Sequence, residues 1–249
     1  MERCTPGAAR NAGARAATGD YAAFLDSDDL WFPWTLEVFA SLASKHASPG
    51  IMAARLRLFT DEGELSGTTE EPGREAAYPD YFASCDDACF VGAGMAVLNR
   101  GRFLETGGFT ELPINSEDHD LILRMGTVKG FVQVLAPVTL GWRRHAGSVT
   151  MDMERCLAGK RHLIEQELRG AYPGGAERRH ERRTIIARNV RPDSMACLRR
   201  GLTRDAWALY RSLFRWHVVQ GRWRYLAGFP VAALIEGFRR RLPGKKNGP

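Results

Sequence analysis

Gly19-Asp20-Tyr21-Ala22-Ala23-Phe24-Leu25-Asp26-Ser27-Asp28-Asp29 is the stretch of this chain that decides its fold. The apolar residues 21–25 predict a short buried strand, and the helical pattern over 7–17 that precedes it is broken at 18–20. The strand stops abruptly at four polar residues, and Pro33 opens a second helical pattern. Helix, strand and helix in this order predict an α/β fold, with a ligand site at the carboxyl end of the strand, where the acidic cluster lies.

The composition predicts one substantial domain with a basic appendage. The chain has 249 residues, of which 44% are hydrophobic, enough for a folded core. Its net charge of +6 is uneven: residues 198–249 hold 12 Lys and Arg against 2 Asp and Glu, so the first 197 residues carry −4. This asymmetry favours a phosphate-rich or anionic lipid surface as the partner of the C-terminal part, rather than nucleic acid along the whole protein.

Cysteine usage and hydropathy indicate the compartment. The five cysteines are scattered and contain no C-x-x-C pair, which argues against a disulfide framework. Cys85 and Cys89 have no second ligand pair, so two thiols are favoured over a metal clip. The first residues lack the apolar stretch of a signal peptide, and no run approaches the roughly 20 apolar residues of a membrane span. We expect a cytoplasmic protein, with a peripheral position at the inner face of the cell membrane as a further possibility.

Asp26 and Asp28 form a D-x-D pair at the predicted strand end. Carboxylates there could hold a divalent cation with open coordination positions for a diphosphate. Taken alone the pair is a weak signal, because Asp-rich turns are common and often cap the next helix.

The wider context strengthens the functional interpretation. Gly7-Ala8-Ala9-Arg10-Asn11-Ala12-Gly13 followed by residues 19–29 resembles the helix, strand and DXD segment of family 2 glycosyltransferases. The resemblance implies a GT-A fold, which is a Rossmann-like mixed sheet flanked by helices, and a nucleotide-sugar donor. It also implies a divalent cation, Mn²⁺ or Mg²⁺, that bridges the donor diphosphate and is held by Asp28 with Asp26.

The same resemblance assigns further donor-binding residues. Asp26 and Ser27 would lie on the ribose side, and Arg10 and Asn11 would support the nucleotide pocket. For Arg10 the alternative is a charge on the surface of a helix.

A second match is Gly107-Gly108-Phe109-Thr110-Glu111 with Glu117-Asp118-His119-Asp120-Leu121 and Arg124. It resembles the GGF and ED-x-DL segments of the same family, with the Arg that follows. The resemblance implies that Asp118 is the general base and that Glu117 positions the acceptor or the base. A sugar hydroxyl is a poor nucleophile, so removing its proton during attack lowers the barrier. The alternative is that these carboxylates merely stabilise the start of a helix.

A third and weaker match is Trp142-Arg143-Arg144-His145-Ala146-Gly147-Ser148, which resembles the aromatic-Arg-x-His-x-x-Ser segment of the family. It implies that His145 contacts the metal ion or the diphosphate and that Arg143 adds positive charge against the leaving group. The alternative for His145 is a structural role.

The resemblance divides the chain into three parts. Residues 1–150 form the expected glycosyltransferase domain, which we expect to be incomplete at its N-terminus, because family members begin with a strand, helix and strand that grip the base. A helical connector, 151–197, and a basic amphipathic helical tail, 198–249, would follow. Apolar residues of the tail recur at helical spacing in one stripe, and the run 225–235 between arginines suits a membrane interface. The stripe comprises Leu198, Leu202, Ala206, Leu209, Leu213 and Trp216.

The expected reaction is metal-assisted, inverting transfer of a sugar to an acceptor hydroxyl on a glycan, lipid-linked or cell-envelope molecule. A nucleotidyltransferase is the runner-up among enzymes, but the Gly-rich phosphate loop that it requires is missing from the start of the sequence. The non-enzymatic alternative is an inactive binding or scaffold module at the membrane surface. Nucleic-acid binding by the tail, through Arg beside Trp and Tyr, is a further alternative, to which the membrane surface is preferred.

Overall fold

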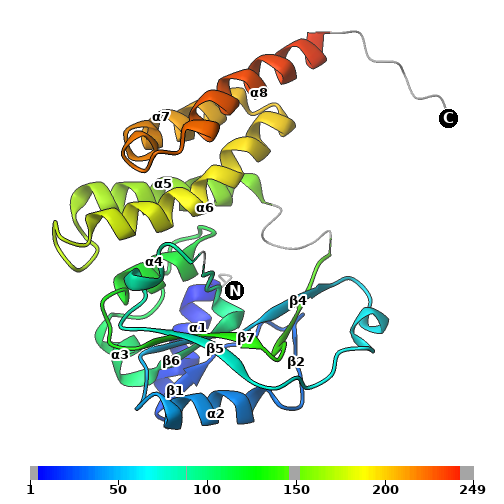
Figure 1. Cartoon of the computed structure of the whole chain (residues 1–249), viewed down its shortest axis with the longest axis vertical. Helices are drawn as coiled ribbons and strands as arrows, with labels where there is room; N and C mark the ends of the chain where they lie inside the picture. The colour runs from blue at the N-terminus through cyan, green and yellow to red at the C-terminus, as the bar shows by residue number, and fades with distance from the viewer. Residues whose placement is uncertain (1–4, 88, 146–151, 242–249) are drawn as a thin grey trace.

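The computed structural model of the protein describes residues 5–87, 89–145 and 152–241 (Figure 1). The α/β part, up to His145, contains two sheets and short helices, and four long helices follow it. In Figure 1 the first two of these helices lie between the sheets and the last two. The predicted mixed sheet flanked by helices is confirmed.

The main sheet has five strands in the order β1-β6-β3-β7-β5. Within it β3 and β7 pair in parallel, and the other pairs are antiparallel. The central strands are rich in Ile, Met, Phe and Val and are buried on both faces because helices cover the sheet. The bounds are β1 Tyr21–Ala23, β3 Ile51–Ala53, β5 Arg74–Tyr78, β6 Ala96–Asn99 and β7 Phe131–Ala136.

A second sheet of three strands has the order β2-β8-β4, with bounds Leu30–Trp31, Leu140–Arg143 and Leu56–Phe59. Only two residues separate β3 from β4, yet the two strands belong to different sheets. The chain changes sheet at Arg55, whose carbonyl accepts hydrogen bonds from the backbone of Thr139 and Leu140, just before and at the start of β8. The short 3-10 helix η1, Glu62–Leu65, lies between β4 and β5.

Helices α1, α2, α3 and α4 flank the sheets over Pro6–Ala16, Thr35–Lys45, Arg100–Glu105 and Glu117–Arg124. Helix α1 begins with a proline, and the side chain of Thr5 caps it by accepting from the backbone of Ala8. Helix α2 buries Phe39 and Leu42 in the smaller of two apolar clusters. Two more 3-10 helices, η2 Phe82–Ser84 and η3 Ala93–Met95, complete this part.

The long helices are α5 Met153–Arg169, α6 Arg179–Arg200, α7 Thr203–Val219 and α8 Trp223–Arg241. A continuous apolar core joins them to the α/β part. The predicted boundary after residue 197 falls inside α6. The single stripe predicted over 198–216 is wrong, because Gly201, with φ +84°, ends α6 and α7 starts afresh.

Helix α8 contains a proline and is tied to α7 at that point. Pro230 has no N–H, so the carbonyl of Leu226 lacks its usual helical partner. The hydroxyl of Tyr210 on α7 donates to that carbonyl at 2.9 Å. Among the described helices, none is long and apolar enough to cross a membrane.

Candidate active site

Arg10 joins the two acidic clusters that the sequence places far apart. From α1, its Nη2 donates to Oδ1 of Asp26 at 2.6 Å and its Nη1 donates to Oε1 of Glu117 at 2.9 Å. Its guanidinium also lies over the ring of Phe109, 5.4 Å from the centroid. Because 107 residues separate Arg10 from Glu117, the tertiary fold alone creates this bridge.

A glycine-containing segment, Gly92-Ala93-Gly94, lies between the same two clusters. The backbone N–H of Ala93 donates to Oδ2 of Asp118 at 3.3 Å. A Cβ atom on Gly94 would lie 3.6 Å from Oδ2 of Asp26, and one on Gly92 would lie 3.4 Å from Oδ2 of Asp118. The acidic residues after β1 and those that begin α4 therefore face the same short piece of backbone.

Asp28 meets His145 at one end of the smaller sheet, just before β2 and just after β8. Oδ2 of Asp28 lies 2.8 Å from Nε2 of His145, and the two side chains are 39% and 42% exposed. A carboxylate oxygen and an imidazole nitrogen are ligands that Mn²⁺ accepts, and Mg²⁺ is commonly held by one or two carboxylates plus substrate phosphates. Within the described residues, no group of three or more such side chains could hold a metal ion. The pair therefore fits a cation whose remaining ligands come from a diphosphate and water.

Asp26 is less free to bind a cation than its sequence position implies. One of its carboxylate oxygens accepts from Arg10, and its side chain is 38% exposed. Ser27, between the two aspartates, is exposed on the turn.

Arg143 and Asp29 fix the turn that carries Asp28. The backbone N–H of Arg143 donates to Oδ1 of Asp29, and its Nε donates to the carbonyl of Asp28 at 3.0 Å. The guanidinium of Arg143 also binds Glu62 and lies over the ring of Phe59. Burial raises the pKa of Asp29 to about 6; the charges of the two neighbouring aspartates add to this effect, and the Arg143 hydrogen bond opposes it. Sequence reasoning missed Asp29, although it is the fourth residue of the same polar cluster.

Asn11 is committed to the backbone. It is 3% exposed, its Nδ2 donates to the carbonyl of Phe109, and its Oδ1 accepts from the N–H of the same residue. The preceding turn needs glycine because Gly107 and Gly108 have φ values of +88° and +72°. Arg124 on α4 donates to the carbonyl of Gly108 at 2.7 Å. Asn11 and Arg124 thus hold the GGF turn in place, and direct donor binding by Asn11 stays a prediction.

Helix α5 supports the start of α4. Ser116, directly before α4, has an unusual φ of +106°, and its Oγ accepts from Nζ of Lys160 at 3.0 Å. Gly159 packs so tightly that a Cβ there would lie 1.5 Å from the carbonyl oxygen of Asn115. Sequence reasoning missed this support, since neither Gly159 nor Lys160 belongs to a motif.

The carboxylates of α4 differ in environment. Burial and the charge of Asp118 raise the pKa of Glu117, and the ion pair with Arg10 acts in the opposite direction. Asp120 is 3% exposed and receives hydrogen bonds from Arg124, His162 and Tyr172. The Asp118 side chain is 21% exposed, against 15% for Glu117 and 4% for Asp120, so it is the most exposed carboxylate of this helix.

The structure brings the predicted residues together in two linked groups. Arg10 connects Asp26 with Glu117, and the Ala93 backbone lies against Asp118. Asp28 and His145 form the second group, which the turn after β1 joins to the first. The last three residues of the third sequence match, 146–148, lie outside the described residues.

Acidic residues at a strand end lie beside a second acidic helix start, on a mixed sheet flanked by helices, and this fold is similar to that of GT-A-type glycosyltransferases. Residues 2–104 match the model of Glycosyl transferase family 2.

Two known proteins show what the chain is similar to. Amylovoran biosynthesis glycosyltransferase AmsB of Erwinia amylovora is 30% identical over an alignment of 173 residues that covers 64% of this chain and 56% of that protein. S. aureus TarS 1-349 in complex with UDP-GlcNAc has a similar fold, with a TM-score of 0.63 and 14% identity, over 87% of this chain and 62% of that 1–349 chain. The chain thus spans less than two thirds of the length of both proteins.

Proposed function

We propose that this protein transfers a sugar from a nucleotide-sugar donor to an acceptor hydroxyl, with inversion at the anomeric carbon. The observation that carries the proposal is the bridge from Arg10 to both Asp26 and Glu117, which joins the expected donor and acceptor sides. The family 2 match over 2–104 and the UDP-GlcNAc bound to TarS support this class of donor.

Asp118 acts as the general base. One of its oxygens accepts from the N–H of Ala93, which holds the carboxylate beside the segment that faces Asp26. During attack it takes the proton of the acceptor hydroxyl, which makes that oxygen a better nucleophile. Glu117, fixed by Arg10, positions Asp118 and the acceptor. Direct displacement needs no covalent enzyme intermediate, so the sugar inverts.

The donor diphosphate lies at the turn after β1. Asp28 and His145, with Asp26 as a further candidate, would hold a divalent cation, Mn²⁺ or Mg²⁺, which would offset the charge of the departing nucleoside diphosphate. Arg143 keeps the turn in place through the Asp28 carbonyl. Ser27 lies on the ribose side with Asp26.

We propose a glycan, lipid-linked or cell-envelope acceptor and a cytoplasmic protein held at the inner face of the membrane by its C-terminal helices. Support comes from the charge of this region, with 12 basic against 2 acidic residues over 198–249. Exposed apolar side chains on α8, such as Leu234 and Phe238, favour a lipid surface over nucleic acid.

Turnover of nucleotide sugars tests the reaction. UDP-glucose, UDP-galactose, UDP-GlcNAc and GDP-mannose are supplied with Mn²⁺ or Mg²⁺, and release of nucleoside diphosphate is measured. Asp118→Asn and Asp28→Asn should each lower the rate at least about 100-fold. Asp20→Asn is the matched control, because Asp20 is exposed and lies outside the site. Equal rates in Asp118→Asn and the control would remove the assignment of the base.

The same assay addresses the scaffold alternative. A wild-type protein that binds none of the four donors, measured by calorimetry with each metal ion, and releases no diphosphate would favour an inactive module. Donor binding without release would instead point to a missing acceptor and keep the proposal.

A further inference from the structure

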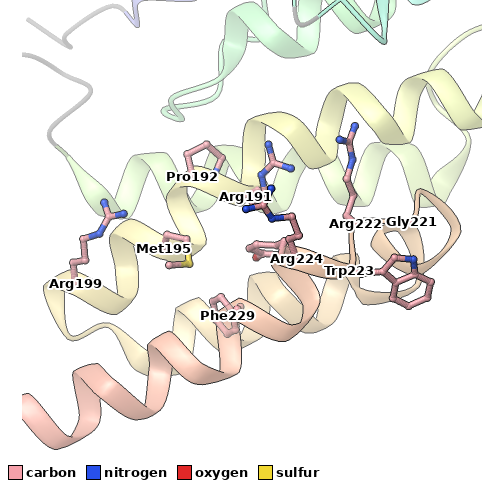
Figure 2. Close-up of a pocket in the computed structure, with 11 residues that line it drawn as sticks. Arg191, Pro192, Met195, Arg199, Gly221, Arg222, Trp223, Arg224 and Phe229 are labelled. Carbon is pink, nitrogen blue, oxygen red and sulfur yellow. The ribbon is translucent and has the colours of Figure 1, made fainter.

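A basic pocket lies between helices α6 and α8, on the side of α6 away from the sheets. Its volume is about 670 Å³, and four of its eleven lining residues are arginines: Arg191, Arg199, Arg222 and Arg224. Figure 2 shows the α6 residues Arg191, Pro192, Met195 and Arg199 on one wall and Phe229 of α8 on another. No carboxylate lines the pocket.

These arginines lack the acidic partners found elsewhere on the long helices. Arg182, for example, pairs with buried Glu167, and Arg161 pairs with Asp205. In the part of the chain that the structure describes, no ion pair is found for the four pocket arginines. Unpaired guanidinium groups around one cavity favour an anion, and phosphate matches their planar donor geometry.

The positive charges of the pocket arginines also act on a buried histidine beside the pocket. His217 on α7 is fully buried, and its ring packs against Tyr225, which lines the pocket. Burial, with the charges of Arg191 and Arg222, lowers the pKa of His217 to about 4. The histidine therefore stays neutral beside these charges and does not add to the repulsion.

An exposed apolar row continues from the pocket along α8. Arg224 and Gly228 line the pocket, and Val231, Ile235 and Phe238 follow at spacings of three and four residues, on the same face of the helix. Val231 is 55% and Phe238 66% exposed, and Trp223 at the pocket is 62% exposed. A phosphate-bearing ligand in water would leave this row uncovered, whereas a bilayer would cover it.

We propose that this pocket binds the phosphate headgroup of an anionic phospholipid while the apolar row of α8 enters the acyl boundary of the bilayer. The proposal rests on the membrane association proposed above and adds a defined headgroup site to it. Arg222 and Arg224 hold the phosphate from the α8 side, and Arg191 and Arg199 hold it from α6. Trp223 sits at the interface between headgroups and water, where amphipathic rings are favoured.

Vesicle sedimentation of the full chain tests the headgroup site. With mixed phosphatidylcholine and phosphatidylglycerol vesicles, Arg222→Gln/Arg224→Gln should bind at least about tenfold more weakly than the wild type. The matched control is Arg204→Gln/Arg215→Gln, which removes the same charge from exposed positions of α7. The control should lose less than about threefold. Equal loss in the two double variants would overturn the pocket in favour of diffuse charge attraction.

The apolar row is tested separately. Ile235→Ser/Phe238→Ser should weaken binding to the same vesicles, and Leu168→Ser, at a 65% exposed position on α5, should not. Unchanged binding of the Ile235/Phe238 variant would reject insertion of α8. If the Arg222/Arg224 variant loses affinity for a single-stranded oligonucleotide but keeps its vesicle affinity, the pocket is a nucleic-acid site and the lipid proposal falls.

Failure of the headgroup site and failure of the catalytic proposal are distinguishable. Donor binding, measured by calorimetry in solution without vesicles, should be the same in the Arg222/Arg224 variant and the wild type. If the protein binds vesicles but binds no nucleotide-sugar donor, only the catalytic assignment is rejected. If the protein binds donor, but the Arg222/Arg224 variant binds vesicles as tightly as the wild type, only the headgroup site is rejected.

Discussion

Nζ of Lys160 lies 3.0 Å from Oγ of Ser116, so helix α5 is fastened to the residue directly before Glu117 and Asp118. The same ammonium group lies 3.4 Å from Asp193 on α6. Helices α5 and α6 therefore help to hold the candidate site in place. This relationship makes the geometry of α4 depend on residues outside every motif.

Lys160→Met should destabilise the fold by about 1–3 kcal/mol, because it leaves Ser116 and Asp193 without their buried donor. The free energy of unfolding in urea measures this change. Lys45→Met is the matched control: Lys45 pairs with Glu75 but is 61% exposed, so its loss should cost less than about 1 kcal/mol. Equal costs would show that Lys160 is no more than a surface charge.

Gly159→Ala should destabilise the protein by about 1–3 kcal/mol, although alanine favours helices more than glycine does. The added Cβ would lie 1.5 Å from the Asn115 carbonyl oxygen, so α5 must move away from the start of α4. Gly13→Ala on α1 is the control, since nothing lies within 4 Å of a Cβ there, and it should stabilise by up to about 1 kcal/mol. Thermal unfolding of the two variants should shift in opposite directions; a shift of both to higher temperature would contradict the close packing.

His217 should make stability fall in mild acid. Its pKa in the folded protein is about 4, against an ordinary value of 6.5, so the unfolded chain binds the proton more readily between these values. The contribution is complete above pH 6.5 and is lost as the pH falls towards 4, by on the order of 3 kcal/mol in total.

His217→Phe should remove this part of the pH dependence because the phenyl ring does not titrate. His180→Gln, at an exposed position of α6, should keep it. Urea unfolding at a series of pH values between 4 and 7 measures both variants. A slope in His217→Phe as steep as in the wild type would show that other groups cause the acid sensitivity.

His145→Ala should raise the Mn²⁺ concentration needed for half-maximal nucleoside diphosphate release by roughly tenfold, because it would remove the proposed second ligand beside Asp28. Calorimetry of Mn²⁺ binding in the presence of UDP gives a second readout that is independent of turnover. His180→Ala serves as the control. Unchanged metal dependence would leave His145 with a structural role.

Local sequence predicted the parts of the fold that depend on neighbours in the chain. The run 21–25 and the polar residues after it gave the short strand and the turn of Asp28, and Gly107 and Gly108 have the positive φ values that a glycine turn permits. Local sequence does not show how distant strands pair: β3 and β4 belong to different sheets, and β5 pairs with β7. The predicted single stripe was wrong because apolar spacing continues across Gly201, whose positive φ ends α6.

The sequence by itself determined which residues are candidates for catalysis and binding, because strand ends, glycine turns and paired carboxylates can be recognised from residues that are neighbours in the chain. The tertiary structure decided which of them meet: Arg10 between Asp26 and Glu117, His145 beside Asp28, and Lys160 beneath Ser116. These contacts join residues 16 to 117 positions apart, so they follow from how sheets and helices pack and not from neighbours in the chain.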